Sequence, residues 1–216
     1  MFKRYLLPLA SCFLLLACSD PTPPTVVVIG QSNARGLLPL EAAPKDSKLW
    51  DRIISSWSDY QVAENRDYDS CESRDWCVGI ESQFPPGTKF IKVAIGGTSI
   101  KREWQHDGEL ADKLIESLSG KNVDQILWLQ GESDAGYINY CDDFEALVSR
   151  FQNETGVLNK WYAFAVKEHE SRYKYVNSCF KSSPYSIFVS STGAETSDGT
   201  HYTQKGFRTL YSHLTM

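Results

Sequence analysis

The sequence predicts a three-layer α/β/α sandwich built around a mostly parallel sheet. Short apolar runs recur along the chain, and several are apolar on both faces, as strands covered by helices on both sides are. Amphipathic segments alternate with these runs. Alternation of strands and helices is typical of a parallel sheet with helices packed on its two faces.

Five apolar runs are expected to be strands: residues 25–29, 90–95, 125–129, 162–166 and 186–190. Three segments with apolar residues at helical spacing are expected to be helices: residues 107–118, 142–151 and 203–214, the last with Thr203 as its N-cap. The stretch from 37 to 86 is less regular, and we expect long loops and short helices there. Residues 25–216 suffice for one domain.

The first residues have the pattern of an export signal. Lys3 and Arg4 precede an apolar run over residues 6–17, which is too short for a stable membrane span but fits a signal-peptide core over residues 1–17. The sequence Leu-Leu-Ala-Cys that ends at Cys18 resembles the lipobox of bacterial lipoproteins. The resemblance implies that Cys18 is lipidated and begins the mature chain, with residues 18–24 as a proline-rich tether. An ordinary signal peptide is the alternative.

Lipidation of Cys18 would place the protein in the bacterial cell envelope, anchored to a membrane. Ser19 favours the outer membrane, on its periplasmic or its surface side. The formal net charge of −5 and the lack of a basic stripe argue against nucleic acid as a partner.

Four cysteines follow the tether, and an even number in an exported chain indicates two disulfides. Cys71 and Cys77 close a short loop and are expected to pair, which leaves Cys141 with Cys179. Three pairings are formally available, and free thiols are an alternative. The spacings match no zinc pattern, so we expect no metal.

Polar, glycine-rich residues follow four of the predicted strands: Gly30–Asn33, Gly96–Ser99, Gln130–Asp134 and Asp198–His201. Ligands of open α/β sheets bind beyond the carboxyl ends of the strands. These residues are therefore expected to meet at one edge of the sheet. Each alone has an ordinary structural explanation, such as Ser32 as a helix N-cap, but their joint placement favours a site.

The residue types point to acyl transfer. A serine hydroxyl becomes a nucleophile when an adjacent base takes its proton, and His201 is the natural base for Ser32. Asp198 lies three residues before His201, close enough to fix the imidazole tautomer. The backbone N–H groups of Ser32 and Gly97 and the side-chain amide of Gln130 are candidate donors to an oxyanion.

The four blocks Gly-Gln-Ser-Asn, Gly-Gly-Thr-Ser-Ile, Trp-Leu-Gln-Gly-Glu-Ser-Asp and Asp-Gly-Thr-His resemble those of the SGNH-hydrolase superfamily. The most similar branch contains the carbohydrate O-acetylesterases of the sialate and acetylxylan type. The resemblance implies a flavodoxin-like fold, no cofactor, and removal of O-acetyl groups from a sugar. It implies the same roles for Ser32, Gly97, Asp198 and His201, and in this branch a glutamine such as Gln130 replaces an oxyanion-hole asparagine.

The roles of the neighbouring residues are less closely determined by the sequence. Glu132 either orients His201 in place of Asp198 or holds neighbouring backbone by hydrogen bonds, the role we favour; Gln31 and Asn33 are expected to brace the serine turn. Trp104 either stacks on a sugar or lies in the core, and the core is the commoner fate.

The sequence thus predicts a serine esterase that removes acetyl groups from sialic acid, xylan or a surface polysaccharide through an acetyl-Ser32 intermediate. Two alternatives stay open: a lipase-like or thioesterase member of the same superfamily, and a catalytically silent carbohydrate-binding lipoprotein.

Overall fold

The computed structural model describes residues 24–35, 48–51, 66–68, 84 and 88–214. Within these residues, seven strands form one sheet in the order β3-β2-β4-β1-β5-β6-β7. Their bounds are β1 Thr25–Gly30, β2 Lys48–Asp51, β3 Arg66–Tyr68, β4 Lys89–Ala94, β5 Gln125–Leu129, β6 Trp161–Phe164 and β7 Ser186–Val189.

The sheet is parallel except at one edge, where β3 pairs antiparallel with β2. β1 lies between β4 and β5, so both neighbours of the first strand come from later in the chain. The strands β2 and β3 correct our expectation of loops and short helices over 37–86. Their pairing with β4 and with each other depends on residues distant in sequence, which a local pattern does not reveal.

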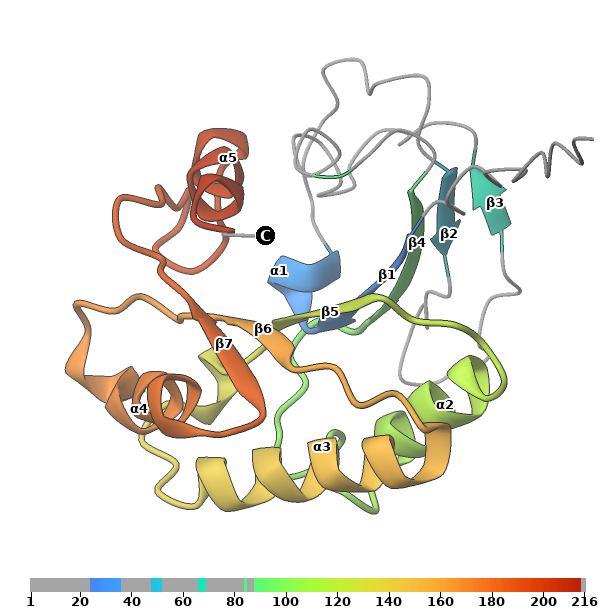
Figure 1. Ribbon diagram of the computed structural model, residues 1–216. Helices are drawn as coiled ribbons and strands as arrows, with labels where there is room; N and C mark the ends of the chain where they lie inside the picture. The colour runs from blue at the N-terminus through green and yellow to red at the C-terminus, as the bar shows by residue number, and fades with distance from the viewer. Residues whose placement is uncertain (1–23, 36–47, 52–65, 69–83, 85–87, 215–216) are drawn as a thin grey trace, which may run out of the picture.

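Helices cover both faces of the sheet, which confirms the predicted fold class. On one face lie α2 Glu109–Leu118, α3 Tyr140–Thr155 and α4 Lys174–Ser182; on the other lie α1 Ser32–Arg35 and α5 Gln204–Ser212 (Figure 1). Short 3-10 helices span Glu132–Asp134 and Ser171–Tyr173. The helix α4 was not predicted, because it is short and has only three apolar residues facing the core: Val176, Cys179 and Phe180.

Two apolar clusters fill the space between the layers. The larger joins α2, α3 and α4 to the sheet and contains Trp104, Trp128 and Trp161, none of which has exposed surface. The smaller joins α5 to the sheet through residues such as Phe207 and Leu210. Because rigid layers hold the strands on both faces, the loops at the strand ends have a fixed frame.

The predicted pairing of Cys141 with Cys179 is confirmed: a disulfide links these residues, with their Cα atoms 5.1 Å apart. It fastens α3 to α4. Cys71, Cys77, Cys18 and the expected signal segment 1–17 lie outside the described residues. Within the described ranges no helix has the length and apolar character needed to cross a membrane.

Candidate active site

A sharp turn at the end of β1 places Ser32 at the edge of the sheet. Gly30 has a φ of 146°, and a Cβ there would lie 2.0 Å from the carbonyl oxygen of Leu129, so only glycine fits. The N–H of Gln31 donates to that same carbonyl oxygen at 3.1 Å. Ser32 then begins the short helix α1. The turn therefore holds the serine directly above the carboxyl ends of the central strands.

The structure brings Ser32, His201 and Asp198 together, although 169 residues separate the serine from the histidine. The Ser32 hydroxyl lies 3.1 Å from Nε2 of His201. On the other side of the ring, Nδ1 of His201 lies 2.6 Å from Oδ2 of Asp198. When Nδ1 donates to this carboxylate, Nε2 carries the lone pair that can accept the serine proton.

Asp198 is held ionised by its own loop. Its Oδ1 accepts the backbone N–H groups of His201 at 2.7 Å and of Thr200 at 2.8 Å. These bonds and the His201 imidazole lower the pKa of the Asp198 carboxyl well below its usual range. The carboxylate therefore remains charged at pH values where an ordinary carboxyl would be protonated, although the side chain is partly exposed to solvent.

Glu132 binds the two side chains that flank the nucleophile. Its Oε2 accepts the side-chain amide of Gln31 at 2.5 Å, and its Oε1 accepts the side-chain amide of Asn33. Ser133 donates to the other side of Gln31 at 2.9 Å. Glu132 thus has a supporting role, as we favoured, but it holds the side chains of Gln31 and Asn33 and not the neighbouring backbone. Asp198 is the carboxylate in contact with His201. Burial raises the pKa of Glu132, and the hydrogen bond from Asn33 opposes that rise.

Asn33 connects the serine turn to the histidine loop. Besides Glu132, its amide N–H₂ donates to the carbonyl oxygen of Thr200 at 3.0 Å, and its oxygen accepts the N–H of Tyr202 at 3.1 Å. Thr200 and Tyr202 are the two neighbours of His201 in sequence. The buried Asn33 side chain therefore fixes the segment that carries the imidazole relative to the segment that carries Ser32.

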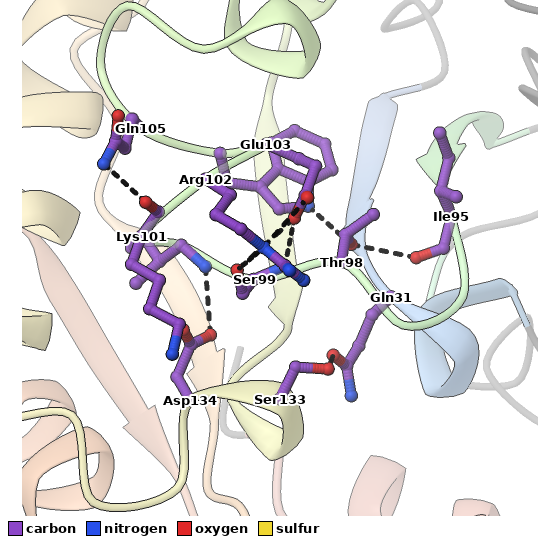
Figure 2. A network of polar contacts seen from close by, with 12 residues as sticks. Gln31, Ile95, Thr98, Ser99, Lys101, Arg102, Glu103, Gln105, Ser133 and Asp134 are labelled. Carbon is purple, nitrogen blue, oxygen red and sulfur yellow. Dashed lines mark hydrogen bonds and ion pairs between the residues drawn. The ribbon is translucent and has the colours of Figure 1, made fainter. Parts of the chain in front are cut away.

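The loop after β4 forms the other side of the site (Figure 2). A Cβ on Gly96 would lie 3.6 Å from Cβ of Ser32, so this loop contacts the serine turn. Two hydrogen bonds hold the loop in place. The hydroxyl of Thr98 donates to the carbonyl oxygen of Ile95, and the N–H of Ile100 donates to Asp134 at 3.0 Å. Buried Glu103 accepts the N–H of Ser99 at 2.7 Å. No pattern in the sequence singled out Glu103 or Asp134 as residues that hold this loop, although Asp134 lies in the segment Gln130–Asp134 that follows β5.

Gly97 lies at the exposed tip of this loop with a φ of 76°, and a Cβ there would meet no atom within 4 Å. Within the described ranges, neither the N–H of Gly97 nor that of Ser32 donates to a protein acceptor. Both are therefore available to an oxyanion placed at the serine.

Gln130 has a different environment from the one we expected. It is fully buried, and its amide N–H₂ donates to Asp134 and, at 3.3 Å, to the carbonyl oxygen of Thr98. Its amide oxygen accepts the hydroxyl of Tyr140 at 2.8 Å. Both amide hydrogens are thus engaged, and the geometry does not support Gln130 as an oxyanion donor. Gln130 directly follows the buried strand β5, and for this reason we expected it at the site. Its side chain points instead toward Asp134 and Tyr140 in the core.

Trp104 lies in the core, with no exposed surface, and its indole N–H donates to Thr98 at 3.0 Å. It is therefore not a surface for stacking a sugar. No group of three or more metal-ligating side chains lies within the described part of the chain.

Comparison with known proteins agrees with this architecture. The chain resembles solved structures of a protein from Arabidopsis thaliana (17% identity, 88% of this chain and 95% of that one, TM-score 0.66) and of NanS (14%, 88% and 95%, 0.62). It also resembles a carbohydrate acetylesterase from Xanthomonas citri (14%, 88% and 54%, 0.64). At these identities the likeness establishes the fold. Among curated protein sequences, none matches the chain.

The similar solved structures and a family model together support the class of carbohydrate acetylesterases for this chain. Within that class, residues 85–215 match the family described as "Carbohydrate esterase, sialic acid-specific acetylesterase". Because the match covers more than half of the chain, the protein belongs to that family.

Proposed function

We propose that this protein is a serine esterase that removes O-acetyl groups from a carbohydrate through an acetyl-Ser32 intermediate. The observation that carries the proposal is the chain of contacts from Ser32 to His201 at 3.1 Å and from His201 to Asp198 at 2.6 Å. A serine and a histidine without the third group would leave the imidazole tautomer undetermined.

In the first step, Nε2 of His201 takes the proton of the Ser32 hydroxyl as its oxygen attacks the acetyl carbon. The carbonyl oxygen gains negative charge, which the N–H groups of Ser32 and Gly97 stabilise. The imidazolium, held by Asp198, then gives its proton to the sugar oxygen, and the sugar alcohol departs. The acetyl group stays on Ser32 as an ester.

In the second step, a water molecule gives a proton to Nε2 of His201 and attacks the acetyl carbon. The tetrahedral intermediate collapses, the bond to Ser32 breaks, and His201 returns the proton to the serine oxygen. The products are acetic acid and the free enzyme. All proton transfers use one imidazole, and none requires a metal or an organic cofactor.

Hydrolysis of 4-nitrophenyl acetate by the purified protein and by Ser32→Ala tests the proposal. We expect turnover by the wild type and a loss on the order of 10⁶ in kcat for the variant. Equal rates would show that Ser32 is not the nucleophile. Mass spectrometry of a rapidly quenched reaction should find one acetyl group on the peptide that contains Ser32.

We also propose that Cys18 is lipidated and anchors the protein in the bacterial cell envelope, as the lipobox-like residues before it indicate. Cys18→Ala should move the protein from the membrane fraction to the soluble fraction and remove the lipid signal from its N-terminal peptide. Continued sedimentation of the variant with membranes would refute the anchor.

A further inference from the structure

A cavity next to the loop that carries His201 has no role in the mechanism proposed above. It has a volume of about 220 Å³ and lies between the segments that follow β6 and β7, which are neighbours at one edge of the sheet (Figure 1). Its lining is Lys167, His169, Glu170, Ser191, Ala194, Thr196, Gly199 and Tyr202. Pockets for drug-sized ligands are about 300–1,000 Å³, so this one suits part of a substrate.

The cavity borders the catalytic segment directly. Two of its lining residues, Gly199 and Tyr202, lie two residues before and one residue after His201. In the proposed mechanism, His201 gives its proton to the departing sugar oxygen, so the sugar must lie on the side of the imidazole. The sugar part of the ester is therefore the part that this mechanism places beside the histidine loop, which the cavity borders.

Lys167 gives the cavity its chemical character. Its side chain is only 6% exposed, and its Nζ lies 3.3 Å from Oε1 of Glu170. No other carboxylate among the described residues is within ion-pair distance of this ammonium. Glu170 is itself shared with Arg172, whose Nε lies 2.6 Å away. An ammonium has three donors, so Lys167 keeps donors for a further acceptor.

The backbone at Lys167 is unusual. Its φ of 36° makes it the single non-glycine residue with a positive φ in the described part of the chain. Such conformations cost on the order of 1–3 kcal/mol and occur preferentially where ligands bind. The conformation occurs directly after β6, where the chain turns beside the cavity.

The cavity lining combines donors and acceptors: the Lys167 ammonium lies beside the Glu170 carboxylate, and the hydroxyl-bearing residues Ser191 and Thr196 come from the segment after β7. This combination suits a pair of neighbouring sugar hydroxyls, since each hydroxyl both donates and accepts. The Glu170 carboxylate would repel an isolated anion, and an apolar group would leave the Lys167 ammonium without a further hydrogen-bond partner.

We propose that this cavity is the subsite for the sugar ring and that Lys167 binds its neighbouring hydroxyls. The inference rests on the proposed function, because it places the sugar by the direction of proton transfer from His201. Lys167 determines specificity in this scheme and takes no part in the bond changes. The expected substrate is an acetylated sugar that keeps free vicinal hydroxyls.

The test compares acetates of primary alcohols that differ in the alcohol. Methyl 6-O-acetyl-glucoside and 9-O-acetyl-N-acetylneuraminic acid carry vicinal hydroxyls, whereas ethyl acetate carries none; released acid is followed in a pH-stat. For Lys167→Met we expect kcat/KM to fall on the order of 10- to 100-fold for at least one sugar ester, mainly through KM. Hydrolysis of ethyl acetate should change by less than about twofold.

Two further variants protect the comparison. Lys167→Gly removes the side chain while tolerating the positive φ, so it addresses any folding defect of Lys167→Met. Lys181→Met is the matched control, since this exposed lysine pairs with Glu168 at 3.2 Å beside the same loop but does not line the cavity. It should hydrolyse every ester at the wild-type rate.

Three results would overturn the proposal: equal losses on sugar ester and ethyl acetate, no loss on either, or a wild type that hydrolyses all three esters and prefers neither sugar ester. Equal losses would mean that Lys167 supports the catalytic loop instead. Binding of the sugar esters to Ser32→Ala, measured by ligand-observed NMR, is independent of turnover. If the wild type hydrolyses no ester while Lys167→Met still weakens binding to Ser32→Ala, the proposed function fails and the subsite stands.

Discussion

Asp198→Asn is the substitution that bears most directly on the proposed mechanism. Asparagine keeps an oxygen that can accept the N–H groups of Thr200 and His201, now at 2.8 and 2.7 Å, so the loop should keep its shape. The other terminal group becomes an N–H₂ facing Nδ1 of His201, where an oxygen lies at 2.6 Å in the wild type. Two donors cannot share that contact.

The neutral imidazole must then place its lone pair on Nδ1 and its hydrogen on Nε2. The hydrogen faces the Ser32 hydroxyl 3.1 Å away, so the imidazole can no longer accept the serine proton. A wrong tautomer of this kind costs about 10⁴ in kcat in serine hydrolases. That factor corresponds to about 5.4 kcal/mol of transition-state stabilisation.

The assay is steady-state hydrolysis of 4-nitrophenyl acetate by the wild type, Asp198→Asn and Glu132→Gln, with thermal unfolding of each as a control for folding. We expect the loss of about 10⁴ for Asp198→Asn alone. If Asp198→Asn stayed within about tenfold of the wild type and Glu132→Gln lost the larger factor, Glu132 would be the residue that orients His201.

The pH dependence follows from the same contacts. The pKa of Asp198 lies below its usual range, so Asp198 stays ionised on the acid side of the profile. Asp198 therefore keeps its contact with Nδ1 of His201 at pH values where a carboxyl of ordinary pKa would already take up a proton. A pH–rate profile with 4-nitrophenyl acetate should show no loss of activity from this carboxyl near its ordinary pKa, and a loss there that is absent from Asp198→Asn would contradict the assignment.

Three other substitutions test the surroundings of the site. Gln130→Ala should lower the free energy of unfolding in urea by about 2–4 kcal/mol, because buried Asp134 and Tyr140 lose their partner; unchanged stability with a loss of 10²–10³ in kcat, an order typical of oxyanion donors, would return Gln130 to the oxyanion hole. Gly97→Ala should cost about 1–2 kcal/mol of stability through its φ of 76°. Its methyl group enters open space where the proposed oxyanion would bind the N–H of Gly97, so kcat/KM should fall further than stability explains; wild-type kinetics would place the substrate elsewhere. Cys179→Ser removes a cross-link between residues 38 apart and should lower the free energy of unfolding by about 3–4 kcal/mol in non-reducing buffer; a change below about 1 kcal/mol would show that the link does not constrain the unfolded chain.

Much of the fold was predictable because the parallel strands are buried on both faces. The runs of β1 and β5 are apolar after their first residue, as expected of short strands covered on both faces. The end of α3 could not be placed from apolar spacing alone, because the helix continues past Phe151 through polar residues to a left-handed glycine at 156. The strand β3 has three residues and is defined by its pairing with β2.

The position of each site residue after a strand was predictable from the sequence. The contacts that their side chains make were less predictable. Because the polar segments follow parallel strands, Ser32 and His201 come to the same edge of the sheet, and this does not depend on the direction of their side chains. The direction of a side chain could not be predicted in the same way, as Gln130 illustrates. Its amide points toward Asp134 and Tyr140, because these buried polar groups need hydrogen-bond partners. Lys167 carries no motif at all, and its burial is evident only from the structure.

The two contacting groups at the centre of the site come from opposite ends of the folded domain, Ser32 from the turn after the first strand and His201 from the loop after the last. A growing chain therefore holds its serine long before it holds the base that would activate it. Any N-terminal fragment that stops before the end of β7 has a nucleophile without a partner, and proteolytic loss of the last residues would silence the remainder. Ester hydrolysis by this protein would thus report that synthesis had passed residue 201 and that the loop after β7 had folded.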